Sequence, residues 1–325
     1  MDYTAKEGKQ EEVLRLVYGD CTLGVHGKGF CYIFSYQSGG LESLAMDGKE
    51  WLYRVPKPTF WRATTDNDRG NKFPLRSGMW LGADMFMDCD GIEVAVDGEE
   101  MELPVAPVNN RYGGQETAHK VKIGYTYKTI TVPATTVEVV YEVSYDGMIE
   151  VRVHYQGRAG LPELPVFGMR FIVPTKAIKY RYEGISGETY PDRKEGGIPG
   201  IYEVEGLPVT PYLVPQDCNV HVDTKWLEVY RDSTLDNSAK GQEVFGIRFA
   251  GKDQDFAFSC IPYTAQELEN ATHQEELPAA RRTVISILGA VRGVGGINSW
   301  GADVEPEYHI DAEKDIAYSF CVTKL

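Results

Sequence analysis

The feature that most limits the fold is the repetition of short runs of β-branched and aromatic residues, separated by Gly, Pro, Asn or Asp. Such runs are typical of β-strands. The clearest case is residues 136–145 and 148–155, which flank Asp146-Gly147. Because an Asp-Gly pair tolerates the positive φ angles of a tight turn, this segment predicts a β-hairpin. The overall pattern predicts an all-β protein.

The same reading predicts nine further strands and only short helices. The strands are expected at residues 14–18, 30–36, 121–131, 169–172, 226–231, 245–250, 256–260, 283–289 and 317–322. Strands at this density imply packed antiparallel sheets. The best helix is residues 265–272, where Thr264 and Glu267 have the spacing of a capping box. No Ser- or Gly-rich linker divides the chain, so we expect a polar tail over residues 1–12 and one domain over residues 13–325.

Charge and hydropathy exclude several classes of protein. Lys plus Arg number 33 and Asp plus Glu number 48, which gives a net charge of −15. Nucleic-acid binding depends on neutralising phosphates with basic residues, so it is excluded here. No apolar run approaches the roughly 18 residues of a membrane-spanning helix, and the polar, acidic N-terminus is unlike a signal peptide. Six scattered cysteines without a CxxC pair are typical of reduced thiols, so we expect a cytoplasmic protein.

Motifs for common chemistries are incomplete. No GxGxxG leads into a helix, no GxxxxGK[ST] or GxSxG is present, and the six histidines have no metal-ligand spacing, so we expect no metal site in this chain. Asp66-Asn67-Asp68 resembles the start of a calcium loop, but the positions that need Gly and Glu hold Asn71 and Ser77. We therefore expect residues 66–68 to form an irregular turn held by side-chain to backbone hydrogen bonds.

Two segments place a tryptophan among Gly and small polar residues: residues 58–70, with Trp61, and residues 295–301, with Trp300. Such a tryptophan on a loop is only weakly shielded, and a sugar ring can present its C–H groups to the open indole face. Taken alone, however, each tryptophan is more simply interpreted as a buried or rim aromatic side chain.

Five segments, taken in order, resemble the C-terminal domain of bacterial family-two β-galactosidases. They are WRATTDNDRG (61–70), GETYPDR (187–193), PYLVPQDCNVHVDTKWLEV (211–229), YTAQELENATHQEEL (263–277) and GGINSWG (295–301). A chain that carries only this domain is similar to the small subunit of heterodimeric lactases. The resemblance implies a two-sheet antiparallel β-supersandwich related to the galactose mutarotases.

The resemblance also implies how the chemistry is shared between two chains. In the family, the acid/base Glu and the nucleophile Glu lie on a TIM barrel, which this chain lacks. We therefore expect no catalytic residue in this chain, a large β-galactosidase subunit as its partner, and a β-D-galactoside such as lactose as the substrate. Mg and Na are expected on the large subunit, and this chain is expected to hold no cofactor.

Within this chain, the resemblance assigns substrate binding to the last motif. Trp300 matches the family's sugar platform at the mouth of the active site, with Asn298 and Ser299 beside it. The usual motif is GGDDSWG, so Ile297 and Asn298 replace two acids, which puts a charge-based role of these positions in doubt.

The first motif matches a mobile loop and its support. Gly70 falls at the start of the segment that opens and closes over the site in family members, followed by Asn71 and Lys72. We expect Gly70 to supply backbone angles that a Cβ would obstruct. Supporting residues in the same motif are Trp61, Arg62, Asp66, Asn67 and Asp68.

Two other functions fit the same fold class. A free-standing aldose 1-epimerase uses a His acid and a Glu base, and His154 or His221 are candidates for the acid. A noncatalytic carbohydrate-binding module is the second alternative.

Overall fold

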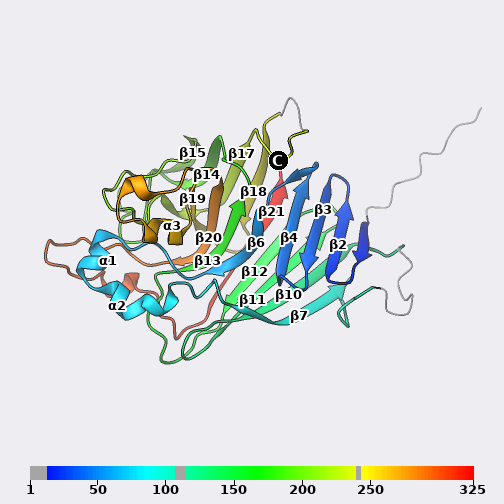
Figure 1. Ribbon diagram of the computed structural model, residues 1–325, viewed down its shortest axis with the longest axis horizontal. Helices are drawn as coiled ribbons and strands as arrows, with labels where there is room; N and C mark the ends of the chain where they lie inside the picture. Colours follow the sequence, from blue (N-terminus) through cyan, green and yellow to red (C-terminus); the bar gives the residue numbers. More distant parts are fainter. Residues whose placement is uncertain (1–12, 107–114, 239–242) are drawn as a thin grey trace, which may run out of the picture.

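Three antiparallel sheets make up the structure, a computed structural model that describes residues 13–106, 115–238 and 243–325 (Figure 1). The predicted tail, residues 1–12, lies outside the described residues. The largest sheet has ten strands and forms one layer. Its strands, in spatial order, are β15 (Pro199–Glu205), β14 (Lys179–Ile185), β17 (Trp226–Arg231), β18 (Phe245–Gly251), β21 (Ile316–Lys324), β12 (Ile149–Tyr155), β11 (Thr136–Ser144), β10 (Lys120–Lys128), β7 (Asp88–Val96) and β8 (Glu99–Met101).

The other two sheets lie next to each other and form the second layer, with β4 beside β6 (Figure 1). The six-stranded sheet has the order β5 (Lys49–Glu50), β4 (Gly40–Met46), β3 (Phe30–Ser35), β2 (Thr22–Gly27), β1 (Leu14–Tyr18) and β9 (Thr117–Ala118). The five-stranded sheet has the order β16 (Val220–Thr224), β19 (Phe256–Ile261), β20 (Thr283–Val291), β13 (Val166–Val173) and β6 (Arg54–Thr59).

The core lies between the two layers. Along β11, buried and less buried residues alternate, so one face of the strand points inward. Aromatic rings from opposite layers meet there: the centroids of Phe34 and Tyr141 lie 5.6 Å apart, and those of Phe171 and Phe249 lie 5.2 Å apart. Burial of these large rings is the main contribution to the stability of the two-layer fold.

The predicted all-β, two-layer antiparallel fold is confirmed, and each strand predicted from the sequence is present within a few residues of its expected bounds. The β11–β12 hairpin forms around Asp146-Gly147, but only Gly147 has a positive φ, of 87°. The N–H of Ser144 donates to the carbonyl of Met148 at 3.0 Å, which leaves three residues, 145–147, in the connection.

Helices are short and gather at one end of the sandwich (Figure 1). They are α1 (Asp66–Gly70), α2 (Phe73–Ser77), α3 (Ala265–Asn270) and the 3₁₀ helices η1 (Gly78–Trp80), η2 (Gln274–Glu276) and η3 (Pro306–Tyr308). The predicted capping box of α3 is present: Thr264 Oγ1 accepts from the N–H of Glu267 at 3.2 Å, and the Glu267 carboxylate accepts from the N–H of Thr264 at 2.7 Å.

The prediction of an irregular turn at residues 66–68 is wrong, because these residues begin α1. Thr65 is the N-cap: its Oγ1 accepts from the N–H of Asp68 at 3.1 Å, and Asp68 Oδ2 accepts from the N–H of Thr65 at 3.0 Å. The side-chain to backbone bonds that we expected are therefore real, but they form a capping box and start a helix.

Candidate functional site

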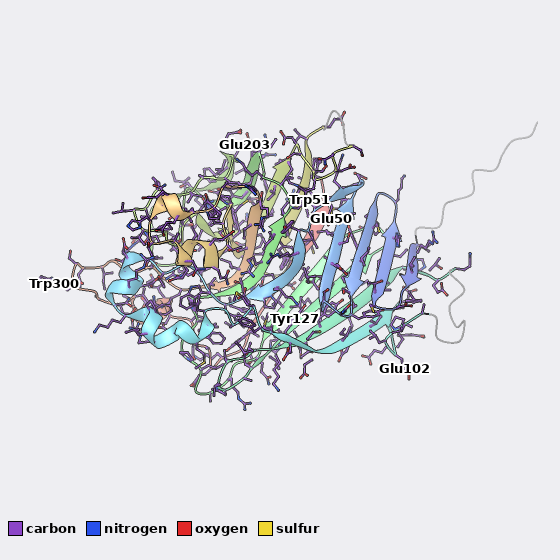
Figure 2. All side chains as sticks on the ribbon, viewed as in Figure 1. Glu50, Trp51, Glu102, Tyr127, Glu203 and Trp300 are labelled. Atoms are coloured by element: carbon purple, nitrogen blue, oxygen red, sulfur yellow. The ribbon has the colours of Figure 1, made fainter. Side chains whose placement is uncertain are left out.

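Trp300 lies at the tip of the loop between β20 and β21, and its side chain is 92% exposed. Figure 2 shows Trp300 at the outer end of the molecule, on the side that carries α1 and α2. Asn298 Oδ1 accepts from the N–H groups of Trp300 at 2.9 Å and of Ala302 at 3.3 Å, and Ser299 lies exposed between them. The structure therefore brings Asn298, Ser299 and Trp300 together in one tight turn that presents the indole to solvent.

The incoming side of this loop is fastened by the GETYPDR segment. The carboxylate of Asp192 accepts from the N–H of Val294 at 2.9 Å and of Gly295 at 2.8 Å. Arg193 donates to the carbonyl of Gly295. From α1, Asn67 Nδ2 donates to the carbonyl of Val294 at 3.0 Å. Two motifs that are far apart in sequence thus hold the base of the Trp300 loop.

The returning side is held by Asp303, which forms ion pairs with Arg292 and Arg76. Asn71 Nδ2 also donates to its carboxylate at 3.1 Å. Partial burial acts to raise the pKa of Asp303, but Arg292 and the N–H of Val304 outweigh this effect, so the pKa lies below its ordinary value. A carboxylate that stays ionised keeps these ion pairs intact.

Beneath the loop lies a buried charge cluster centred on Asp68. Its carboxylate is 3.2 Å from the guanidinium groups of both Arg62 and Arg292, and all three side chains are at most 3% exposed. Arg292 also pairs with Glu163 at 3.2 Å. Arg62 donates to the carbonyl of Gly293 at 2.9 Å, which connects the cluster to the loop that carries Trp300.

Trp61 is buried and not exposed to solvent as Trp300 is. Its Nε1 donates to a carboxylate oxygen of Glu269, in α3, at 3.1 Å, and its ring stacks on Phe73 with centroids 6.5 Å apart. Glu269 also accepts from the N–H of Thr64 at 2.7 Å. Asp66 lies exposed on α1 and pairs with Arg69 at 3.0 Å. Glu269 therefore ties α3 to the segment that leads into α1.

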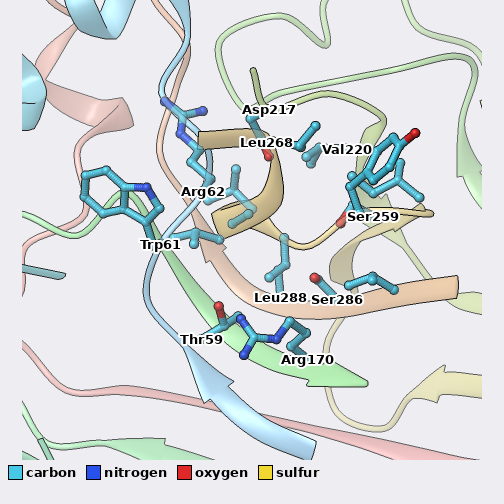
Figure 3. Close-up of a pocket in the computed structure, with 16 residues that line it drawn as sticks. Thr59, Trp61, Arg62, Arg170, Asp217, Val220, Ser259, Leu268, Ser286 and Leu288 are labelled. Atoms are coloured by element: carbon cyan, nitrogen blue, oxygen red, sulfur yellow. The ribbon is translucent and has the colours of Figure 1, made fainter. Parts of the chain in front are cut away.

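A small cavity lies below the first motif, lined by Trp61, Arg62, Asp217, Ser259 and other side chains (Figure 3). Asp217 Oδ2 accepts from the hydroxyl of Tyr190 at 2.9 Å. Burial raises the pKa of the Asp217 carboxyl to about 7, although Arg62 and the Tyr190 hydroxyl favour the ionised form. Asp217 is therefore a group that titrates near neutral pH in the folded chain.

A family model described as β-galactosidase small chain matches residues 26–322. The chain belongs to the β-galactosidase small-chain family. It is 62% identical to the β-galactosidase small subunit of Latilactobacillus sakei, over 94% of this chain and 96% of that one. It is 32% identical to a β-galactosidase of Halalkalibacterium halodurans and 30% identical to one of Streptococcus thermophilus. The chain spans 29% and 28% of the length of these two relatives.

Among solved structures, the chain is similar to a putative aldose 1-epimerase from Escherichia coli K12, with a TM-score of 0.44 and 11% identity over 96% of this chain and 98% of that one. It is also similar to a galactose mutarotase-like protein from Lactobacillus casei, with a TM-score of 0.39 and 9% identity over 94% of this chain and all of that one. The family assignment rests on the sequence matches.

The two histidines considered for an epimerase lie in different surroundings. His221 is buried against Phe258, with ring centroids 4.7 Å apart, and burial lowers its pKa to about 4. His154, on β12, is partly exposed and pairs with Asp315 at 3.1 Å. Neither lines the cavity of Figure 3. With the 62% identity to a small subunit, these positions disfavour the epimerase alternative.

Within residues 13–106, 115–238 and 243–325, no group of three or more His, Cys, Asp or Glu side chains is placed to hold a metal ion. In the same part of the chain, no helix is long and apolar enough to cross a membrane. The expectation that Mg and Na belong to the large subunit stays a prediction.

The physical reason that we expected for glycine at position 70 is wrong. Gly70 is the last residue of α1, its φ is not in the left-handed region, and an added Cβ would meet nothing within 4 Å. Left-handed residues nearby include Lys72, with a φ of 62°, and Gly301, with a φ of 78°. Asn71 is held by Asp303, as described above. The mobility of residues 70–72 stays a prediction.

We predict that Gly70→Ala leaves the free energy of unfolding unchanged or raises it by up to about 1 kcal/mol, because Ala loses less conformational freedom in a helix. Gly301→Ala is the matched comparison: its Cβ would lie 3.0 Å from the carbonyl oxygen of Gly70, at a φ that disfavours side chains. We expect Gly301→Ala to lower the free energy of unfolding by about 1–3 kcal/mol. Urea unfolding measures the free energy of unfolding of both variants. A larger loss for Gly70→Ala than for Gly301→Ala would contradict this account.

We predict that Asp217→Asn changes the pH dependence of stability. The pKa of Asp217 is about 7 in the folded chain and about 4 in the unfolded chain. Between these pH values the carboxyl group is protonated in the folded state and ionised in the unfolded state. The stability of the wild-type chain therefore falls as pH rises from about 4 to 7 on account of this group. The asparagine variant lacks this loss and retains an acceptor for Tyr190.

The free energy of unfolding of the variant minus that of wild type should be about 1–3 kcal/mol larger at pH 8 than at pH 5. One pKa unit is worth about 1.4 kcal/mol, and the lower end of the range allows for solvent around this site. Urea unfolding at both pH values measures the gain. Asp20→Asn, at an exposed position, is the control. A difference between Asp217→Asn and wild type that does not depend on pH would reject the assignment.

Proposed function

We propose that the chain is the small subunit of a β-galactosidase and completes the active site of a separate large subunit that carries a TIM barrel. In the assembled enzyme, Trp300 forms one wall of the sugar site, and terminal β-D-galactosides such as lactose are the substrates. The single observation that supports this most strongly is the exposure of Trp300, 92%, on a loop that is fastened on both sides.

An exposed indole fits a sugar site for a physical reason. A galactoside presents C–H groups on one face, which pack against an aromatic ring, and hydroxyl groups on its edges, which hydrogen bond to polar neighbours. Ser299, which is exposed, offers such a polar group next to the ring. Because the loop is already held by Asp192 and Asp303, little conformational freedom remains to be lost when the sugar binds.

The bond-breaking carboxyl groups are proposed to come from the large subunit. Retaining hydrolysis needs two carboxyl groups about 5 Å apart, one of which must hold a proton to protonate the leaving oxygen. Asp303 does not suit that role, since its ion pairs lower its pKa. Asp192 accepts two backbone hydrogen bonds, and Asp68 lies buried between two arginines. Asp303, Asp192 and Asp68 therefore stabilise the Trp300 loop and its base through ion pairs and hydrogen bonds.

Titration of this chain into a fixed amount of a large subunit tests the proposal. The large subunit that pairs with the 62% identical Latilactobacillus sakei small subunit is a suitable partner. Lactose hydrolysis should rise with added chain and level off at a 1:1 ratio. Activity that is independent of the added chain would reject a role in completing the site. Tight galactoside binding by this chain alone would instead favour a carbohydrate-binding module.

A further inference from the structure

The segment that follows α1 exposes an unusual number of large apolar side chains. Five of the nineteen exposed large hydrophobic residues among those described lie within twelve positions. They are Leu75, Met79, Leu81, Met85 and Phe86. Single exposed apolar residues are common on protein surfaces, but a cluster marks a surface that another molecule covers. We call these five residues the apolar segment.

The apolar segment is built on fixed anchors. Phe73, Ser77, Trp80, Ala83 and Asp84 alternate with it and are buried. Trp80 stacks on Phe60 with centroids 5.4 Å apart, and its Nε1 donates to the carbonyl of Pro162 at 2.9 Å; Asp84 pairs with Arg170 at 2.7 Å. A surface held in this way loses little conformational freedom on binding, which is a property of a preformed interface.

The position of the apolar segment connects it with the Trp300 loop. It begins in α2, which packs beside α1, and Arg76 of α2 pairs with Asp303 at the returning side of the loop. Figure 1 places α1 and α2 at the end of the molecule where Figure 2 shows Trp300. Whatever covers the apolar segment therefore lies next to the proposed sugar site.

We propose that the apolar segment is a docking surface for the large chain of the β-galactosidase; this rests on the proposed function. About 70% of the length of the Halalkalibacterium halodurans and Streptococcus thermophilus relatives lies outside the part that matches this chain, so each of them carries a further body larger than this chain. In a chain of net charge −15, residues 73–86 carry only two charged side chains, Arg76 and the buried Asp84. Depletion of charge is typical of the core of a permanent interface.

The test compares two double variants. Met85→Ser with Phe86→Ser removes two side chains that are 58% and 61% exposed, and Ile198→Ser with Ile201→Ser removes two that are 66% and 58% exposed at the edge strand β15. Binding to the Latilactobacillus sakei large subunit is measured by surface plasmon resonance. Near-ultraviolet circular dichroism checks that each variant is folded. We expect the first pair to raise the Kd at least tenfold and the second pair to change it less than twofold.

Each outcome decides the proposal. Equal Kd values for wild type and the Met85→Ser, Phe86→Ser variant would overturn it. An equal rise in Kd for the Ile198→Ser, Ile201→Ser control would also overturn it. A wild-type chain that does not bind the large subunit at all would reject the proposed function itself, and the docking surface with it. If the chain alone sediments as a dimer that the first variant breaks, a second copy occupies the surface and the proposal is wrong. Leu75→Ser, an independent change at a side chain that is 84% exposed, should also weaken binding.

Discussion

Replacing Asp68 with Ala is expected to lower the free energy of unfolding by about 3–5 kcal/mol, because one member of a buried ion cluster is removed and its partners stay charged. Arg292 keeps Glu163 and Asp303 as ion partners. Arg62, which is 3% exposed, is left with backbone carbonyls in place of its 3.2 Å partner. The N–H of Thr65 loses its Asp68 acceptor as well, while the N-cap bond from the N–H of residue 68 to Thr65 Oγ1 is kept.

Asp66→Ala is the matched control for this prediction. Asp66 lies two residues away in the same helix, but its side chain is 74% exposed and pairs only with Arg69 at the surface. Exposed ion pairs contribute about 0–1 kcal/mol, so the control should stay within that range. Both differences are measured by urea unfolding. If Asp68→Ala does not fold, Asp68→Asn, which keeps an acceptor for the cap, should still cost more than Asp66→Ala; equal losses would contradict the account.

Replacing Trp300 with Ala is expected to raise the Michaelis constant for lactose about 5–150-fold in the assembled enzyme, which corresponds to about 1–3 kcal/mol of stacking on an aromatic platform. Because the side chain is 92% exposed, its removal should change the free energy of unfolding of this chain by less than about 0.5 kcal/mol. A loss of substrate binding without a loss of stability separates a binding role from a structural one.

Trp300→Phe and Tyr145→Ala complete the comparison. The first keeps an aromatic face and should recover most of the binding. The second removes an exposed aromatic ring on the β11–β12 turn, and the Michaelis constant should not change. Steady-state kinetics and binding of a competitive galactoside inhibitor distinguish affinity from turnover. An unchanged Michaelis constant for Trp300→Ala would remove the indole from the sugar site.

The predicted strands carry runs of β-branched and aromatic residues, whether buried and less buried positions alternate, as in β11, or the strand is buried throughout, as in β19. Several strands were missed, among them β14, although its buried and less buried positions alternate. β15 is an edge strand in which no residue is fully buried, so it carries no apolar alternation. β6 contains Pro56 and Pro58, which are tolerated because it lies at the edge of the five-stranded sheet.

The residues of the candidate site, like the strands, were predicted only in part from the sequence. Trp300 and the first motif were identified by the resemblance, and the structure brings them to one end of the molecule. Asp192 lies in one of the resembling segments, so a signal for it was present. Arg292 and Asp303 gave no signal, because their roles depend on partners far away in sequence: the ion pair of Arg292 with Asp68 joins residues 224 positions apart.

Asn298 has a structural role that its side-chain oxygen performs. In the family motif its position holds an acid, and the exchange put a role of that charge in question. Here the amide oxygen of Asn298 accepts two backbone N–H bonds that close the turn around Trp300. A carboxylate oxygen can accept the same bonds, so this function of the position requires an acceptor and no charge.

The central claim is that this chain supplies part of a sugar site and none of the groups that break the glycosidic bond. The most direct test is lactose turnover by the purified chain alone, at a concentration that gives full activity when the large subunit is added. We predict no cleavage above the uncatalysed rate by the chain alone and rapid cleavage by the mixture. Robust cleavage by the chain alone, free of any large subunit, would contradict the account.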